Sequence, residues 1–383
     1  MLPFDFQCPT RIIFGPGKLN ALGSLARSID AKRALVVSDR GIVAAGHTPR
    51  GIQSLEHNGI AVALFDRIDE NPTTANVDDG LAMAKEVRPD LIIGIGGGSS
   101  MDCAKGINFL YSCGGRMQDY WGDGKATGPL LPMIAVPTTA GTGSETQSYA
   151  LITDAATHVK MACGDKRAAF RAAILDPELT LTQPKRVTAL TGIDALAHAL
   201  ETYVTKRRNP LSLVFSREAW RHLAPNMSRV INEPTNLPAR AAMQLGACLA
   251  GLAIENSMLG AAHALANPLT ANYGIAHGEA IAVMLPHAIR RNRQQVEAWY
   301  RELIDCADGV KLEKNDRTAA EAVAKFVAEL AHIGGLNGKL SDCRVPHDHL
   351  SKLAEEAKQQ WTARFNPIEL TKTDFLELYE AAF

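Results

Sequence analysis

The chain has 383 residues, of which 46% are apolar and 21% are charged, and its 40 Lys and Arg nearly balance its 41 Asp and Glu to a net charge of −1. This composition excludes a disordered chain and provides no overall positive field for nucleic acid. The length suits two domains.

The cysteines indicate a reducing compartment. All 7 are widely scattered, and no two form a Cys-x-x-Cys pair. We therefore expect neither a disulfide framework nor a cysteine zinc site. The first residues lack a basic segment followed by an apolar one, and no uninterrupted apolar run is long enough to span a bilayer. The sequence predicts a cytoplasmic protein without a membrane or nucleic-acid partner.

Short apolar runs alternate with helical stretches in the first half of the chain. Strands are predicted at 33–38, 59–65, 90–95 and 133–137, with a helix over 76–86. Apolar runs of this kind are typical of parallel strands that helices cover on both faces. We therefore predict an α/β domain at 1–183 with a doubly wound parallel sheet that binds a nucleotide.

Strand-like runs disappear from about Pro184 onward. Long helical patterns rich in Ala and Leu replace them, with Pro or Gly near most boundaries. Helices are predicted over 192–204, 210–223, 238–265, 278–290 and 318–332. We therefore predict an all-helical domain at 184–383.

A glycine-rich turn follows the predicted strand 90–95. Gly96, Gly97, Gly98 and Ser99 open a helix, and glycines let the backbone approach a ligand while the first N–H groups of a helix attract an anion. A pyrophosphate suits this turn, although the spacing matches neither Walker A nor the usual Rossmann pattern. The alternative is a tight strand-to-helix turn that binds nothing.

Two further strand ends carry polar groups. Asp39 follows the strand 33–38, where a carboxylate either accepts hydrogen bonds from an adenosine 2′-hydroxyl or caps a helix. The segment 137–145 follows the strand 133–137 and gathers hydroxyls and glycines, among them Thr138, Thr139, Thr142 and Ser144. Doubly wound folds bind ligands at such strand ends.

The helical half contains a metal-binding pattern. Asp194 and His198 are four residues apart, so they share one helix face among apolar neighbours and can chelate one ion. The alternative is an Asp–His hydrogen bond between successive turns. His263 and His277 lie in small, apolar surroundings, and either alone would suit a protein core. Together, one carboxylate and three imidazoles suit Fe²⁺, Zn²⁺, Mn²⁺ or Ni²⁺.

Over nearly its whole length the chain resembles the iron-containing (group III) alcohol dehydrogenases, of the lactaldehyde reductase and propanediol dehydrogenase type. The likeness rests on Phe14-Gly15-Pro16-Gly17, Asn71-Pro72-Thr73, Gly96-Gly97-Gly98-Ser99-x-x-Asp102-x-Ala104-Lys105, Thr138-Thr139-Ala140-Gly141-Thr142, His277-Gly278 and the final Leu378-Tyr379-x-x-Ala382-Phe383. Asp194, His198, His263 and His277 match the metal positions of the family.

The resemblance implies NAD as cofactor and Fe²⁺ as metal, with His263 and His277 catalytic through the metal. The cofactor contacts that it implies are Asp39, Asn71, Gly96, Gly97, Gly98, Ser99, Asp102, Thr138, Thr139, Thr142, Ser144, Lys160 and Leu179. Substrate contacts are expected at Tyr149, Ile254 and Asn267. In the cleft between the domains, the metal would polarise the oxygen of a small alcohol, diol or aldehyde during reversible hydride transfer. A homodimer or larger homo-oligomer is also expected.

The chain departs from the family at two positions. Asn267 replaces a histidine that many relatives carry, which puts a proton relay through it in doubt, and Ile368 follows Asn366-Pro367 where relatives often have Arg. Three other functions remain open. They are a hydroxyacid–oxoacid transhydrogenase with a tightly held nucleotide, a lyase like the dehydroquinate synthases, and a non-catalytic binding module.

Overall fold

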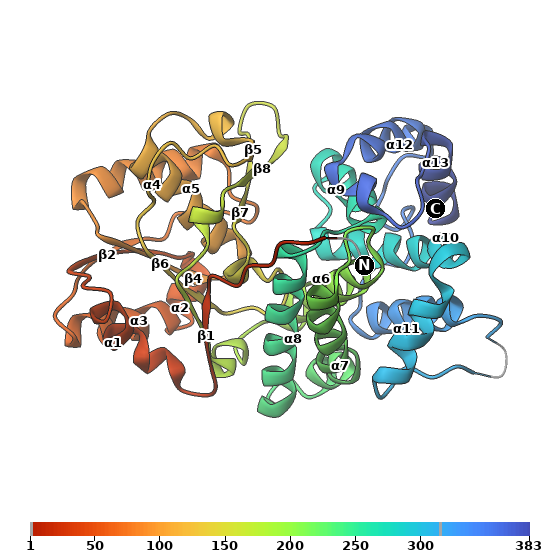
Figure 1. Ribbon diagram of the computed structural model, residues 1–383, viewed down its shortest axis with the longest axis horizontal. Coiled ribbons are helices and arrows are strands. Elements are labelled where there is room, and N and C mark those ends of the chain that lie inside the picture. Colours follow the sequence, from red (N-terminus) through yellow and green to blue (C-terminus); the bar gives the residue numbers. More distant parts are fainter. Residues whose placement is uncertain (1–2, 314–315) are drawn as a thin grey trace. The chain divides into compact units, whose positions relative to one another are not determined.

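The computed structural model describes residues 3–313 and 316–383 and divides into two compact units. The α/β unit comprises Cys8–Thr139 and Gly143–Gln183, and the helical unit comprises Pro184–Phe383 together with Ala140–Thr142 and the described residues before Cys8. Figure 1 shows the first unit mainly in red to yellow and the second mainly in green to blue. Along the chain, the α/β unit ends at Gln183 and the helical unit continues from Pro184.

Two short segments differ from the predicted domains, which assigned them to residues 1–183. Gln7 exchanges hydrogen bonds with the Asn256 side chain, at 2.9 and 3.0 Å, which ties the N-terminal segment to the helical unit. Gly141 lies so close to Thr191 that a Cβ atom at Gly141 would stand 2.6 Å from the Thr191 Cβ. These contacts explain why both segments group with the helices.

The α/β unit is built on a six-stranded sheet with the order β1-β9-β6-β4-β2-β3, in which every described pair is parallel. Its strands are β1 (Arg11–Phe14), β2 (Arg33–Val37), β3 (Ala61–Phe65), β4 (Leu91–Gly96), β6 (Met133–Pro137) and β9 (Ala172–Leu175). The four predicted strands are therefore confirmed as β2, β3, β4 and β6, whereas the sequence did not predict β1 and β9.

Helices cover both faces of this sheet, as Figure 1 shows. Successive residues of β2 point to opposite faces, so Leu35 and Val37 join one core while Ala34 and Val36 join the other. The first core contains residues of α4 (Thr74–Val87) and α5 (Gly98–Cys113), and the second contains residues of α1 (Leu22–Arg27) and α3 (His47–His57). The predicted doubly wound sheet is thus confirmed.

Shorter elements complete the α/β unit. A second sheet has the order β5-β8-β7, with β5 (Gly122–Asp123), β7 (Tyr149–Thr153) and β8 (Lys160–Gly164). α2 (Arg40–Ala44) follows β2. The 3-10 helices are η1 (Lys18–Ala21), η2 (Met117–Tyr120), η3 (Ser144–Thr146), η4 (Lys166–Ala168) and η5 (Pro177–Thr180).

The helical unit surrounds α6 (Lys185–Val204), in which every residue from Gly192 to Val204 is buried. A helix that is buried all round belongs to the core of a large domain. The others are α7 (Pro210–Asn232), α8 (Leu237–Glu255), α9 (Ala261–Tyr273), α10 (His277–Cys306), α11 (Ala319–Ile333), α12 (Leu350–Gln359) and α13 (Lys372–Ala381), with η6 (His347–His349) and η7 (Trp361–Phe365).

The single helix predicted over 238–265 is wrong. The chain leaves helical geometry after α8, and α9 begins only at Ala261. Gly260 has a non-helical backbone, and side chains from outside this segment accept hydrogen bonds from the first N–H groups of α9. The break places His263 in the first turn of a new helix, where the sequence placed it at the end of a long one.

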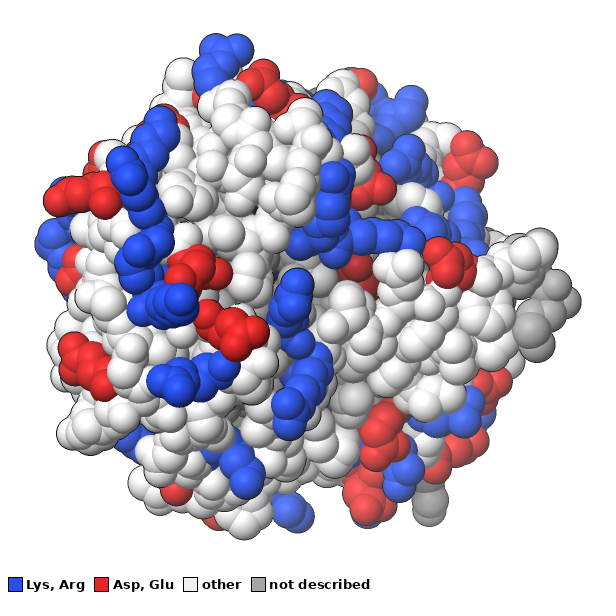
Figure 2. Space-filling model, turned by 60° about the vertical axis from the view of Figure 1, so that its left-hand side comes forward, with Lys and Arg blue, Asp and Glu red and all other residues white. Residues whose placement is uncertain are grey.

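Among the described residues, one helix, α8, is long and apolar enough to cross a membrane by length and composition, with a mean hydropathy of 1.4 over its most apolar window. Because 67% of that window is buried inside the protein, its apolar character is also that of a core helix. On the face drawn in Figure 2, short rows of Lys and Arg lie beside Asp and Glu, in keeping with the near-zero net charge.

Candidate functional site

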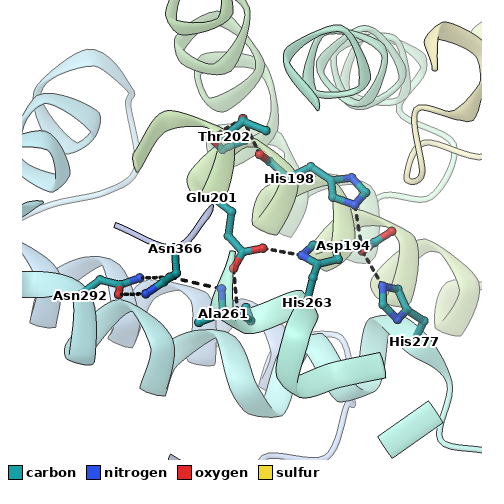
Figure 3. A network of polar contacts seen from close by, with 11 residues as sticks. Asp194, His198, Glu201, Thr202, Ala261, His263, His277, Asn292 and Asn366 are labelled. Carbon is teal, nitrogen blue, oxygen red and sulfur yellow. Dashed lines mark hydrogen bonds and ion pairs between the residues drawn. The ribbon is translucent and has the colours of Figure 1, made fainter. Parts of the chain in front are cut away.

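The four predicted metal ligands converge in the helical unit (Figure 3). The Asp194 Oδ1 atom lies 3.4 Å from His198 Nε2, 3.5 Å from His263 Nε2 and 3.6 Å from His277 Nε2. Two ligands bound to one ion at about 2.1 Å in tetrahedral geometry stand roughly 3.4 Å apart. The ligand atoms of Asp194, His263 and His277 also lie within 4.8 Å of one another, which suits one shared cation, whereas His198 adjoins this group through Asp194.

The burial of these groups also suits a cation. Asp194, His198 and His263 are at most 5% exposed, and His277 is half-buried. Asp194 Oδ1 and His263 Nε2 are buried without a hydrogen-bond partner. Buried polar atoms are costly when unpaired, and a divalent ion would satisfy both. The residues present therefore fit a metal of the class that the sequence predicted.

The electrostatics of the cluster favour positive charge. Burial by itself would raise the pKa of the Asp194 carboxyl, but the surrounding histidines lower it below its usual value. Burial disfavours a charged His263, yet Glu201 and Asp194 raise its pKa to about 9. The two carboxylates thus create a buried site that attracts either protons or a metal cation.

Sequence reasoning missed Glu201, which lies next to the cluster. Its Oε2 atom is 2.5 Å from His263 Nδ1, and its side chain is almost fully buried. The signal was present, because Asp194, His198 and Glu201 stand at positions i, i+4 and i+7 of α6 and share one face. A carboxylate on the helix face that carries two predicted metal ligands is well placed to hydrogen-bond a third ligand, here His263.

The predicted nucleotide contacts gather at the carboxyl ends of the strands in the α/β unit. A Cβ atom at Gly96 would stand 3.4 Å from Asp39 Oδ2, and one at Gly97 would stand 3.4 Å from the Thr139 methyl group. The Thr138 N–H donates to the Gly96 carbonyl at 2.9 Å. The ends of β2, β4 and β6 therefore bring these residues together, as parallel strands require.

The two carboxylate oxygens of Asp39 face different groups. Its Oδ1 atom accepts the Ile42 N–H at 3.0 Å and so caps α2. Oδ2 faces the glycine turn at Gly96. The helix cap that the sequence analysis gave as the alternative role of Asp39 is therefore present. It uses only Oδ1, so Oδ2 still faces the glycine turn.

Other predicted contacts border the same turn. The Asn71 N–H donates to Ser99 Oγ at 3.3 Å, which joins the loop after β3 to the first turn of α5. Gly98 is the first residue of that helix. The Thr138 Oγ1 atom is buried without a hydrogen-bond partner. A ligand at this edge would meet the free N–H groups of the helix start and an unpaired hydroxyl.

Asp102 and Ser144 are engaged with the protein itself. The Ser144 hydroxyl donates to Asp102 Oδ1 at 2.6 Å, and the buried Lys105 ammonium donates to Ser144 Oγ at 2.9 Å and to the Ser144 carbonyl at 2.8 Å. Lys105 also donates to the Tyr149 carbonyl at 2.7 Å. Burial raises the pKa of the Asp102 carboxyl. This network fixes the loop after β6 to α5. Asp102 and Ser144 therefore hold in place the loops at the carboxyl ends of β4 and β6, where the nucleotide contacts are predicted.

Other predicted residues lie on separate elements. Lys160 begins β8, the buried Leu179 lies in η5, and Thr142 belongs to the segment grouped with the helical unit. Of the predicted substrate residues, Tyr149 begins β7 with its ring over Gly164, and Ile254 lies in the last turn of α8. The Asn267 amide lies one turn beyond His263 and donates to Gln360 Oε1 at 3.1 Å.

Comparison with known proteins accounts for nearly the whole chain. Residues 9–177 match the iron-containing alcohol dehydrogenase family, and residues 188–383 match the C-terminal region of the Fe-containing alcohol dehydrogenase family. The chain is 34% identical over 386 residues to the 1,3-propanediol dehydrogenase of Citrobacter freundii, covering 99% of each.

Solved structures agree with this match. The structure superposes on a crystal structure of 1,3-propanediol oxidoreductase with a TM-score of 0.95, at 33% identity and with 100% of both chains covered. It also resembles sulfoacetaldehyde reductase from Bifidobacterium kashiwanohense in complex with NAD⁺, with a TM-score of 0.88, 26% identity, and 100% of this chain and 99% of that chain covered.

Proposed function

The chain belongs to the iron-containing alcohol dehydrogenase family and is an alcohol oxidoreductase, and we propose that it interconverts small primary alcohols or diols with their aldehydes, with NAD as the hydride carrier. In the oxidative direction, the substrate carbon gives a hydride to NAD⁺ and the hydroxyl loses a proton, yielding aldehyde, NADH and H⁺. The convergence of Asp194 with three histidine Nε2 atoms carries this proposal.

The chain's own residues set the conditions for this reaction. Asp194, His198, His263 and His277 would hold a divalent ion, with Fe²⁺ proposed from the family, and such an ion supplies the Lewis acidity that polarises an alcohol or carbonyl oxygen. Burial keeps water away from Asp194, His198 and His263 and strengthens their electrostatic effect. The Asn267 amide neither accepts nor releases a proton, so proton transfer does not pass through this side chain.

NAD is supported by Asp39 and by the relative whose structure was solved with NAD⁺. A carboxylate at this strand end accepts hydrogen bonds from a ribose 2′-hydroxyl and repels a 2′-phosphate. The glycine turn at the start of α5 would hold the pyrophosphate, because its backbone N–H groups are available at a helix N-terminus.

Asp39→Asn is expected to shift cofactor preference toward NADP⁺. Asn keeps the cap on α2 but removes the negative charge that faces the turn. A hydrogen bond to a charged group contributes about 1.5–3 kcal/mol, so kcat/KM for NAD⁺ should fall roughly ten- to a hundredfold, while that for NADP⁺ rises. Steady-state kinetics with both cofactors measure the change. An unaltered preference would remove Asp39 from the ribose site.

The substrate class can be tested on the purified protein. Metal analysis should find about one divalent ion for each chain, and an NADH-linked assay at 340 nm should show turnover within a panel of C2–C4 alcohols, diols, aldehydes and hydroxy acids. Since the relative from Citrobacter freundii acts on 1,3-propanediol, diols are the first substrates to try. No absorbance change across the panel would contradict the proposal. Hydride exchange between two substrates without added NAD⁺ would instead indicate a transhydrogenase.

A further inference from the structure

The Glu201 carboxylate joins a predicted metal ligand to the backbone that carries it. One oxygen, Oε2, contacts His263 Nδ1 at 2.5 Å (Figure 3), and the other, Oε1, accepts the Ala262 N–H at 2.7 Å. Glu201 is 5% exposed, so water does not compete for these contacts. One side chain of α6 thus holds both the ring of His263 and the peptide group before it.

The chemistry of these contacts determines which nitrogen of His263 is free. The Ala262 N–H is a donor, and an ionised carboxylate offers only acceptors, so the Nδ1 atom must carry a proton to bond with Oε2. When a cation takes the place of a proton on Nε2, the proton that remains on Nδ1 leaves the lone pair of the ring on Nε2. That is the atom 3.5 Å from Asp194 Oδ1. Glu201 therefore aims the lone pair of His263 at the cation site.

A second set of contacts fixes the same turn of α9. No side chain at the N-cap position, Gly260, caps this helix. Instead, Asn366 Oδ1 accepts the Ala261 N–H at 3.2 Å, and Asn366 exchanges two amide hydrogen bonds with Asn292, at 3.0 and 2.8 Å. The first N–H groups of a helix need acceptors, and here distant elements supply them. Asn366 is 1% exposed, so this support is buried as well.

We propose that Glu201 is a positioning residue that sets both the ring tautomer and the place of His263, with the Asn292–Asn366 pair holding the adjacent backbone. This inference rests on the proposed function, because it assumes that His263 binds a metal. Partners of this type, which hydrogen-bond the second nitrogen of a ligating histidine, typically change metal affinity 10- to 100-fold when they are replaced.

Glu201→Gln tests the proposal because Gln has the same shape but only one acceptor. If its oxygen keeps the Ala262 N–H, its NH₂ group faces His263 Nδ1 and favours the tautomer with the proton on Nε2, which cannot bind a metal through Nε2. We expect the affinity for Co²⁺, measured by competition with a chelator, to fall roughly 10- to 100-fold. The Co²⁺ absorption spectrum should change as well, which a purely structural role would not predict.

The matched control is Glu321→Gln, which makes the same chemical change elsewhere in the helical unit. Glu321 pairs with Arg290 at 2.8 and 3.1 Å and touches no metal ligand in the described contacts, so its replacement should leave Co²⁺ affinity unchanged. Should Glu201→Gln fail to fold, Glu201→Asp keeps the charge but is too short to reach both donors, and its Co²⁺ affinity should also fall.

The outcomes separate this inference from the proposed function. Wild-type Co²⁺ affinity and spectrum in a folded Glu201→Gln or Glu201→Asp variant would overturn the positioning role, even if Asp194→Asn still lost metal. Unchanged Co²⁺ binding in both Asp194→Asn and Glu201→Gln would overturn the metal site itself. Loss of Co²⁺ affinity in both variants, and not in Glu321→Gln, would support both proposals.

Discussion

Asp194→Asn should abolish turnover and lower metal affinity about 10²- to 10³-fold. Asp194 Oδ1 is the atom common to all three histidine contacts, and it is the only carboxylate oxygen among the proposed ligands. Four-ligand zinc sites bind with about 10–16 kcal/mol, or roughly 2.5–4 kcal/mol for each ligand, which corresponds to this loss. Competition with a chelator gives the affinity, and the NADH-linked assay gives the turnover.

Asp305→Asn is the control for this change. Asp305 lies exposed near the end of α10, so its replacement removes the same charge from the helical unit without touching the cluster. It should keep wild-type metal content and activity. If Asp194→Asn also bound metal as tightly as the wild-type protein, the four side chains would not share a cation, and the dehydrogenase chemistry would need another centre.

The sequence predicted much of the α/β unit because its signals are local. The strand β6 has the bounds that its apolar run indicated, β2 ends one residue earlier than predicted, and β4 is shifted by one residue at both ends. Alternate residues of such runs enter two cores, which only a sheet covered on both faces allows. The edge strand β1 has no fully buried residue, so the same pattern could not reveal it.

The sequence indicated which residues could bind a metal, but it did not indicate the residues that hold these side chains in place. Asp194 and His198 are visible as a helical pair, and His263 and His277, in small apolar surroundings, complete the set of one carboxylate and three imidazoles that the family resemblance also implies. The start of α9 depends on Glu201 and Asn366, which lie 61 and 105 residues from the N–H groups that they accept. No local pattern reports such distant acceptors, so the segment 238–265 read as one helix.

Gly278→Ala should destabilise the helical unit and loosen the metal site together. A Cβ atom at Gly278 would stand 2.2 Å from the Leu190 carbonyl oxygen and 2.7 Å from its carbon, both of them backbone atoms of α6. Backbone cannot rotate away as a side chain can, so the start of α10 must move from α6. Such overpacking lowers the free energy of unfolding by about 1–3 kcal/mol, which urea denaturation measures.

The same displacement would carry His277 with it, because His277 precedes Gly278 and begins α10. Metal ligands tolerate shifts of only about 0.2 Å, so the Co²⁺ affinity of the folded Gly278→Ala variant should fall at least roughly tenfold. Gly338→Ala is the matched control, since a Cβ atom there meets no atom within 4 Å. Equal stability of the two variants would show that α10 can leave α6 at little cost. Equal metal affinity would show that His277 does not depend on this close approach between the two helices.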